Sequence, residues 1–294
     1  MTSHSVEIRR CRPLLGTFVD VSAEADSAER AGAALEAAFA AILRVQRRMS
    51  FHDAESDVSR LNRDAARGPV EVDAWTCEVL AAARDLHAET RGAFDVSVAP
   101  YLQRWGYLPA SPDSTRSAPA ADQAAIDLLP GRRVRFRRPL CIDLGGIAKG
   151  FAVDRAIEAL ERAGASAGLV NAGGDLRVFG ATPAAIHVRD PGAPGRLLPI
   201  GSLENAAFAT SAGYFARRRW RGRRVSPLVD PVRGRPWTKP VSVSVRAATC
   251  LAADALTKVV AILGARSAPI LRAHSASGYL VTRAGVAVAG EAAA

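Results

Sequence analysis

Cysteine is scarce in this sequence, and its four residues are too widely spaced to suggest a shared role. Cys11, Cys77, Cys141 and Cys250 form no CxxC pair and have no histidine-rich neighbourhood. Zinc sites and disulfide frameworks both depend on clustered or regularly spaced cysteines. The sequence therefore predicts buried free thiols, and it indicates neither a zinc site nor a disulfide framework.

Long apolar runs are also absent. No segment reaches the roughly 18 uninterrupted apolar residues that a membrane-spanning helix requires. The segment 1–16 has basic side chains but no apolar run before a small-residue cleavage site, and Cys11 lacks the apolar stretch that precedes a lipoprotein anchor. We therefore expect a soluble, cytoplasmic protein with no membrane span.

Acidic residues are outnumbered by basic ones, which gives a formal net charge of +10. Such an excess favours an anionic partner, for example a phosphorylated ligand, a nucleic acid or an acidic protein surface. Six arginines fall within residues 217–224 around Trp220, and this pattern is typical of a basic patch with a stacking platform for single strands. We favour the alternative, an exposed and solvated loop, so nucleic acid is not an expected partner.

The remaining composition is that of a globular chain, because 294 residues with a hydrophobic share of 49% can bury a sizeable core. Helices are predicted at 28–48, 74–90, 148–163 and 248–263. Strands are predicted at 15–23, 133–136, 168–171, 175–179, 185–189, 206–210, 225–229, 240–246 and 278–282, and one more ends at Leu144. Runs of strands with few helices between them indicate an α+β fold. Segment 109–123, rich in Pro, Ser, Ala and Asp, is predicted as a loop within a single domain, 1–294.

Residues 143–150 read Asp-Leu-Gly-Gly-Ile-Ala-Lys-Gly, where two glycines follow a predicted strand and a helix begins directly afterwards. Backbone N–H groups in such a turn can bind an anion at the helix N-terminus, and glycine allows the close approach that a diphosphate needs. The run is neither a Walker A motif nor the GxGxxG fingerprint, and taken alone such a turn is more often structural. A second turn, Asn-Ala-Gly-Gly-Asp at 171–175, could bring more backbone donors to the same site.

Together with Ala-Val-Asp at 152–154, this run resembles the hallmark of the FAD:protein FMN transferase (ApbE-type) family. Other blocks are similar to the family in order and approximate spacing, from about residue 12 to 283. They are Leu15-Gly-Thr17, Met49-Ser50 through Asn62, Gly92-Ala-Phe-Asp95 through Trp105-Gly106, Leu169 through Asp175, Ala209-Thr-Ser211, Asp230-Pro231 with Gly234, and Ala253-Asp-Ala-Leu256. The resemblance implies an ApbE-like α+β fold, with mixed or antiparallel sheets and flanking helices in one compact unit.

The resemblance also implies an activity. Family members bind FAD and, with Mg²⁺, transfer its FMN phosphoryl half to a threonine of a target flavoprotein, releasing AMP. Two alternatives stay open, namely hydrolysis of FAD to FMN and AMP, and a catalytically silent flavin-binding or flavin-delivery protein. The implied partners are FAD and a flavoprotein that carries the acceptor threonine.

The same resemblance assigns residues to the site. Residues implied at the diphosphate and metal are Gly145, Gly146, Ile147, Ala148 and Lys149, and the metal ligands would be Asp254 and the carbonyl of Ala148. Residues implied along the FAD pocket are Ser56, Asp57, Asn62, Asp95, Gly173, Gly174, Asp175, Thr210 and Ser211.

The chain departs from the family pattern at several positions. His52 stands where the family has an aromatic residue beside the isoalloxazine, and an imidazole can still stack and exchange protons near neutral pH. Pro227 stands where the family usually has a histidine three residues before an aspartate, and proline offers neither a base nor a phosphate contact. Residues 210–214 read Thr-Ser-Ala-Gly-Tyr, in which the glycine is displaced relative to the family's order.

The last departure is Lys258. The family's metal-binding helix reads Asp-Ala-Leu-x-Thr, whereas this chain reads Asp254-Ala-Leu-Thr-Lys258. Mg²⁺ prefers oxygen ligands, and a protonated lysine cannot coordinate it. We therefore predict that Lys258 replaces the metal, which puts the Mg²⁺ requirement in doubt, and that Asp254, Lys258 and His52 carry the catalysis. On helix 248–263 a buried stripe is expected at Ala252, Leu256, Val259, Val260 and Leu263, with Asp254 and Lys258 one turn apart on another face.

Overall fold

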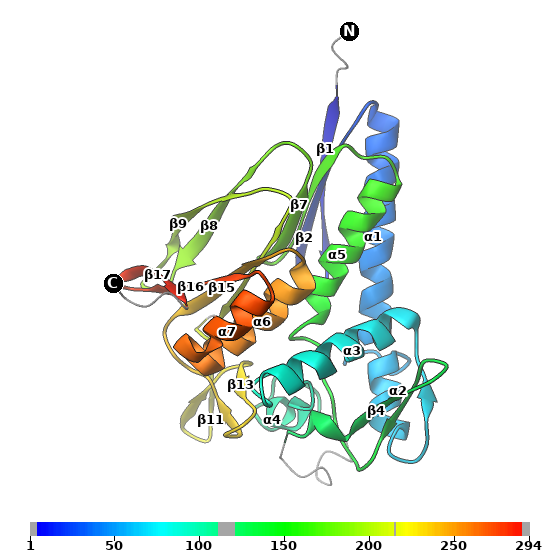
Figure 1. The fold of residues 1–294 in the computed structure, drawn as a ribbon, viewed down its shortest axis with the longest axis vertical. Coiled ribbons are helices and arrows are strands. Elements are labelled where there is room, and N and C mark those ends of the chain that lie inside the picture. The colour runs from blue at the N-terminus through cyan, green and yellow to red at the C-terminus, as the bar shows by residue number, and fades with distance from the viewer. Residues whose placement is uncertain (1–4, 111–120, 215, 290–294) are drawn as a thin grey trace.

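An eight-stranded antiparallel sheet forms the centre of the molecule (Figure 1). The computed structural model describes residues 5–110, 121–214 and 216–289. Residues two apart, such as Val19 with Val21 and Val243 with Val245, are fully buried, because alternate strand residues point to the same face. In spatial order the strands are β1 (Val6–Leu14), β2 (Thr17–Ala25), β6 (Ala167–Ala172), β7 (Asp175–Phe179), β10 (Ala207–Ala212), β15 (Ser242–Ala247), β16 (Ser277–Thr282) and β17 (Gly285–Ala289).

Three helices pack against one another and against this sheet (Figure 1). They are α1 (Ala28–Met49), α5 (Ala148–Arg162) and α6 (Cys250–Leu263). Helix α1 starts at Ser27, whose hydroxyl accepts a hydrogen bond from the Arg30 N–H group, as an N-cap residue does. Its buried residues recur three and four positions apart, which places them on one stripe facing the sheet and α5. They are Ala31, Ala34, Leu35, Ala38, Phe39, Ile42, Val45 and Met49.

A separate hairpin covers apolar side chains of the sheet outside the main core. It consists of β8 (Ala184–Asp190) and β9 (Ala193–Leu203). Ile186, Val188 and Leu203 of the hairpin pack with Val178 and Phe208 of the sheet in a second apolar cluster. The hairpin therefore screens this part of the sheet from water.

The chain between α1 and α5 forms the lower part of the molecule in Figure 1. Its elements are α2 (Asp57–Asp64), β3 (Val70–Glu71), α3 (Ala74–Glu89), α4 (Ala99–Arg104), η1 (Gln123–Ala125), β4 (Ile126–Leu129) and β5 (Arg133–Phe136). The remaining short elements are β11 (Arg218–Trp220), β12 (Arg223–Val225), β13 (Val229–Asp230), β14 (Arg235–Pro236), η2 (Gly264–Ser267) and α7 (Ala268–Ala273). One hydrophobic core contains residues of the lower part, including Phe94 and Leu140, and of the sheet and helices, so the two parts pack as one unit.

Several predicted elements differ from the structure. The strand predicted at 15–23 lies at 17–25 and is the second arm of a hairpin whose first arm, β1, the sequence did not indicate. The two-residue turn is Leu15-Gly16, and both residues have positive φ (54° and 71°). Such turns favour Asn-Gly or Asp-Gly, and leucine rarely adopts this conformation, so the turn left no recognisable signal.

The predicted strand ending at Leu144 is absent, because a side chain replaces the missing strand partner. Asn62 donates to the Ile142 carbonyl (2.9 Å), and its own carbonyl accepts from the Ile142 N–H group (2.7 Å). The single strand predicted at 225–229 is also wrong, since β12 ends at Val225 and β13 begins at Val229. Most of the predicted loop 109–123 lies outside the described residues.

The segment of six arginines forms a hairpin of β11 and β12 rather than the expected loop. Arg219, Arg221, Arg223 and Arg224 are exposed on it, as expected for solvated side chains. Within the described part of the chain, no helix is both long and apolar enough to cross a membrane.

Candidate functional site

Two cavities meet at the glycine turn that precedes α5. The larger, about 850 Å³, is lined by the β1–β2 turn, the end of α1 and His52. The smaller, about 440 Å³, is lined by Phe94, Asp95, Ser211 and Lys258 among others. Leu108, Asp143, Gly145 and Lys149 line both cavities, so the two cavities adjoin at this turn.

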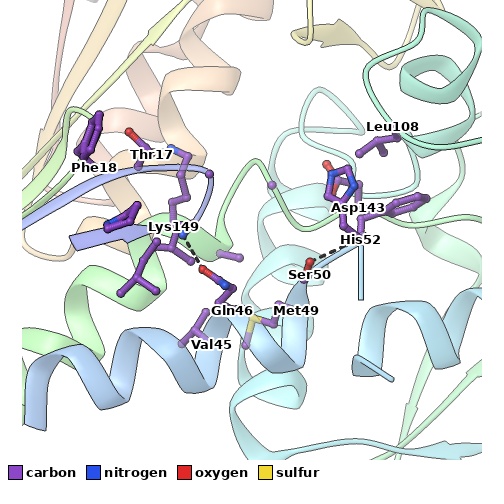
Figure 2. Close-up of a pocket in the computed structure, with 17 residues that line it drawn as sticks. Thr17, Phe18, Val45, Gln46, Met49, Ser50, His52, Leu108, Asp143 and Lys149 are labelled. Atoms are coloured by element: carbon purple, nitrogen blue, oxygen red, sulfur yellow. Dashed lines mark hydrogen bonds between the residues drawn. The ribbon is translucent and has the colours of Figure 1, made fainter. Parts of the chain in front are cut away.

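Asp143 and His52 occupy one side of the larger cavity, and Lys149 lies with Thr17 on the other (Figure 2). Burial raises the pKa of the Asp143 carboxyl, while the Gly145 N–H group and the charge of His52 oppose that rise. A Cβ atom at Gly145 would lie 2.9 Å from the Asp143 carboxylate, so a larger residue there would displace this side chain. Asp143 begins the glycine-rich motif, but the sequence did not single it out as a site residue.

Helices α5 and α6 cross closely behind the turn. A Cβ atom at Gly150 would lie 2.2 Å from the Cys250 carbonyl oxygen, so only glycine permits this approach. Asp154, buried on α5, accepts hydrogen bonds from the Cys250 and Leu251 N–H groups (2.8 Å each) and from Arg177 (2.7 Å). A carboxylate at a helix N-terminus satisfies N–H groups that have no partner in the helix. These contacts fix α6 relative to the glycine turn.

Two ion pairs, each of a partly exposed lysine and a buried carboxylate, lie at this crossing. Lys149 pairs with Asp175 of β7, and Lys258 pairs with Asp254 one turn before it on α6. Asp175 and Asp254 are 1% and 0% exposed. Burial raises the pKa of Asp175, and the charge of Asp254 raises it further, against the effect of the two lysines. Burial disfavours the charge on Lys149, but Asp175 and Asp254 outweigh it and raise its pKa.

Helix α6 is buried on more faces than the sequence predicted. Asp254 and Thr257 are fully buried, whereas Ala252 and Leu263 of the predicted stripe are only half-buried. The Thr257 hydroxyl donates to the Asp254 carbonyl (2.6 Å) and shares a hydrogen bond with Ser211 (2.8 Å). The expected apolar stripe is therefore incomplete, because α6 lies between the sheet and α5 and contacts both.

Some of the residues predicted along the FAD pocket, and some of those predicted at the diphosphate and metal, lie at or next to the two cavities. Asp95 and Ser211 line the smaller cavity, and Thr210 bonds to Ser244 behind it (2.8 Å). Ile147 is buried at the start of α5, and Ala148 lines the larger cavity. That these five residues contact a ligand stays a prediction.

Ser56, Asp57 and Asn62 are not among the described residues that line either cavity. Ser56 caps α2 and donates to the Ser50 carbonyl (2.6 Å), which holds the loop that carries His52. Asp57 accepts from the Asp73 N–H group (2.8 Å) and the Thr76 hydroxyl (2.7 Å).

The second glycine turn, at 171–175, is also not among the described residues that line the two cavities. A Cβ atom at Gly173 would lie 2.5 Å from the Thr17 hydroxyl, and the Gly174 N–H group donates to Asn171 (2.8 Å).

The structure adds several lining residues that the sequence did not assign. Thr17 and Phe18 enter the larger cavity from the β1–β2 turn, and Phe18 is 73% exposed (Figure 2). Leu108 lines both cavities, and Phe94 lines the smaller one. The block Leu15-Gly-Thr17 was the available signal for the turn, but nothing in it indicated a cavity wall.

The structure of the chain is similar to those of flavin transferases. It matches the crystal structure of the ApbE protein from Thermotoga maritima with a TM-score of 0.80 and 28% identity, covering 96% of both chains. The apo flavinyl transferase ApbE from Pseudomonas stutzeri matches with a TM-score of 0.81 at 24% identity, covering 98% of both. The predicted α+β fold with antiparallel sheets is confirmed.

Curated relatives agree with this likeness. The FAD:protein FMN transferase of Vibrio cholerae is 31% identical over 75% of this chain and 70% of its own length. That of Haemophilus influenzae is 28% identical over 81% and 75%. The model of the ApbE family matches residues 15–280, and the chain belongs to the ApbE family. The resemblance seen in the sequence, and the prediction of an enzyme of this family, are confirmed.

Proposed function

We propose that this chain binds FAD and transfers its FMN half to a threonine hydroxyl of a target flavoprotein, releasing AMP. The observation that carries the proposal is that two cavities adjoin at the glycine turn before α5. FAD has a ring system at each end and a diphosphate between them, which matches two cavities joined at Gly145 and Lys149. Cavities of several hundred cubic ångströms are of the size that binds such ligands.

The turn offers the groups that a diphosphate needs. Helix α5 has no side-chain cap at Ile147, but the Ala148 N–H group donates to the Leu144 carbonyl (2.8 Å) and the Gly150 N–H group to Asp254 (3.1 Å), so two of its first three N–H groups already have partners. The positive end of the helix dipole favours an anion there. Lys149 and Lys258 add two ammonium groups beside Gly145 and Gly146. A small set of polar groups thus converges on one point of the junction.

The proposed step forms one bond and breaks one. The threonine oxygen attacks the phosphorus of the FMN half, and the bond from that phosphorus to the bridging oxygen breaks. AMP leaves with the bridging oxygen and its electron pair, and the hydroxyl proton passes to a base. The candidate base is His52 of the larger cavity, with Asp143 beside it. It takes the place of the histidine that the family usually has where this chain has Pro227. Lys149 and Lys258 stabilise the charge that develops on the leaving phosphate.

The residues present do not fit Mg²⁺, which the family resemblance implies. Among the described residues no group of three or more His, Cys, Asp or Glu side chains could hold a metal ion. One Asp254 carboxylate oxygen accepts from the Gly150 N–H group (3.1 Å), and the other pairs with Lys258. This donor set does not fit Mg²⁺, and the proposed step does not pass through it.

Transfer is tested by incubating the protein with FAD and a flavoprotein domain that carries a candidate threonine, with and without Mg²⁺. In-gel flavin fluorescence detects covalent attachment, and chromatography detects AMP and FMN. Covalent flavin on the domain, absent when its threonine is changed to valine, supports the proposal. Release of FMN and AMP without attachment would show hydrolysis instead, and FAD binding without AMP would show a silent binding protein.

Ligand choice gives a test that needs no acceptor. FAD should bind more tightly than riboflavin, since riboflavin lacks the diphosphate and loses its contacts with the glycine turn and lysines. Equal affinities in a fluorescence-quenching titration would contradict the assignment of the diphosphate to this turn.

A further inference from the structure

Lysine is rare in this chain, and its distribution is uneven. Only three of the 39 basic residues are lysines, Lys149, Lys239 and Lys258, and the rest are arginines. Two of the three line the smaller cavity, and Lys239 is exposed outside the lining of either cavity. Lysine carries a compact point charge on a flexible stem, whereas the arginine guanidinium is broad and planar. The chain thus has its compact cations, Lys149 and Lys258, at the smaller cavity, where there is room for a small charge in a fixed position.

Both ammonium groups are held in place by buried carboxylates. Lys258 donates to the Asp254 carboxylate and to its carbonyl oxygen (2.9 Å). Lys149 donates to the Asp175 carboxylate. An ammonium group has three N–H donors, so each lysine keeps at least one for a ligand in the cavity. Because Asp175 and Asp254 are buried, both lysines are oriented before any ligand binds.

The neighbouring oxygens cannot readily take over as metal ligands. Thr257 is the hydroxyl closest in sequence to Lys258, but its oxygen is engaged by Ser211 and by the Asp254 carbonyl. Gly146 lies against the stem of Lys258, since a Cβ atom there would be 3.6 Å from the lysine Cε. The ammonium therefore lies between the glycine turn and Asp254, where a divalent ion would need to contact both.

We infer that Lys149 and Lys258 form a built-in pair of cations that binds the diphosphate of FAD in place of a divalent metal ion. The inference rests on the proposed function for the identity of the ligand. Each lysine provides a charge-assisted hydrogen bond to a phosphate oxygen, and Asp175 and Asp254 position the two ammonium groups. The consequence is that FAD binds to this chain equally well with and without a metal.

The test is a titration of the full-length protein with FAD, followed by flavin fluorescence, after treatment with EDTA and again with added Mg²⁺. The unaltered protein should give the same dissociation constant in both conditions. In Lys258→Thr, loss of a charge-assisted hydrogen bond should weaken FAD binding about 10- to 100-fold in EDTA. Mg²⁺ should restore binding, because the substitution supplies a hydroxyl and frees Asp254.

Lys258→Met and Lys239→Thr are the matched controls. Lys258→Met should bind FAD weakly in both conditions, because it removes the charge without adding an oxygen ligand. Lys239→Thr, at the exposed lysine, should behave as the unaltered protein does. If Lys258→Thr does not fold, the titration of the unaltered protein decides alone.

The outcomes separate this inference from the proposed function. FAD binding by the unaltered protein only when Mg²⁺ is present overturns the inference and leaves the proposed function standing. Equal FAD binding by Lys258→Met and the unaltered protein in EDTA also overturns it. Failure to bind FAD under either condition refutes the proposed function itself.

Discussion

The two sides of the candidate site are built differently. The inner wall consists of Gly146, Lys149 and Lys258, and the two lysines pair with Asp175 and Asp254, which are buried and are not among the lining residues. The outer wall consists of Leu15, Thr17, Phe18, Ser50 and His52 from the β1–β2 turn and the end of α1, and its side chains are half-buried or exposed. The lysines of the inner wall are thus fixed by buried carboxylates, whereas the side chains of the outer wall are largely accessible to solvent.

This difference suggests that the two walls bind different parts of the ligand. A diphosphate needs donors at fixed positions, and ion pairs with buried carboxylates at a tight helix crossing provide them. A ring system, or the incoming segment of an acceptor protein, needs apolar contact and room to enter, which exposed groups such as Phe18 and His52 provide. We therefore expect substitutions in the inner wall to change stability and FAD binding together, and substitutions in the outer wall to change ligand binding alone.

The largest effect is expected for Gly150→Ala. The added methyl group would meet the backbone carbonyl of Cys250, which cannot move without displacing α6. The free energy of unfolding should fall by about 3 kcal/mol, the upper range for overpacking, as measured by urea denaturation. Gly68→Ala is the control, because a Cβ atom there meets nothing within 4 Å and the φ of Gly68 is not positive. Equal stability of the two variants would show that the helix crossing is not tight.

The next effect is expected for Asp154→Ala, which removes the acceptor of two hydrogen bonds at the start of α6 and of one from Arg177 of β7. The loss of unfolding free energy should be about 2–3 kcal/mol, and FAD affinity should fall with it because α6 carries Lys258. Asp85→Ala removes an exposed carboxylate paired with Arg84 (2.9 Å) and should change stability by less than about 0.5 kcal/mol. A stable Asp154→Ala protein with unchanged FAD affinity would mean that α6 is positioned by other contacts.

A smaller effect, on binding alone, is expected for Phe18→Ala in the outer wall. Its ring is 73% exposed, so thermal stability should not change measurably. FAD affinity should fall about three- to tenfold if the ring packs on the ligand, the range for an aromatic contact. Leu197→Ala, at an exposed leucine of β9, controls for the loss of surface apolar area. Titration with riboflavin and with AMP shows which half of FAD the ring contacts, and no change with any ligand contradicts the role.

The smallest effect concerns thiol reactivity, which reports how accessible each cysteine side chain is to solvent. Cys11 is exposed, so the prediction of buried thiols is wrong for it, whereas Cys141 and Cys250 are buried. Burial raises the pKa of Cys141 to about 12, so at pH 8 only about one thiol in ten thousand is the reactive thiolate. A thiol reagent should label Cys11 rapidly and leave Cys141 and Cys250 unmodified until urea unfolds the protein. Labelling of Cys141 at the rate of Cys11, located by peptide mass spectrometry, would show that this region opens.

Much of the fold could be predicted from the sequence because its signals are local. Helices α1, α5 and α6 appear within one or two residues of their predicted bounds, since apolar spacing and end residues such as Gly164 depend on the nearby chain alone. The hairpin of β1 and β2 was missed, because its Leu15-Gly16 turn adopts a conformation that leucine rarely takes. The extended segment at Ile142 is held by Asn62, a partner 80 residues away.

The same distinction applies to the candidate site. The sequence by itself determined the family, the glycine turn at 143–150 and the presence of a lysine at 258, because these are matters of residue identity and order. Only the tertiary structure decided that Gly150 is needed for the crossing of α5 and α6, that Asp154 caps α6, and that Ser56 and Asp57 support the site from outside the cavities. The physical reason is that burial and hydrogen bonding between distant segments exist only once α5, α6 and the sheet have packed together, whereas turn and helix preferences are already present in the local chain.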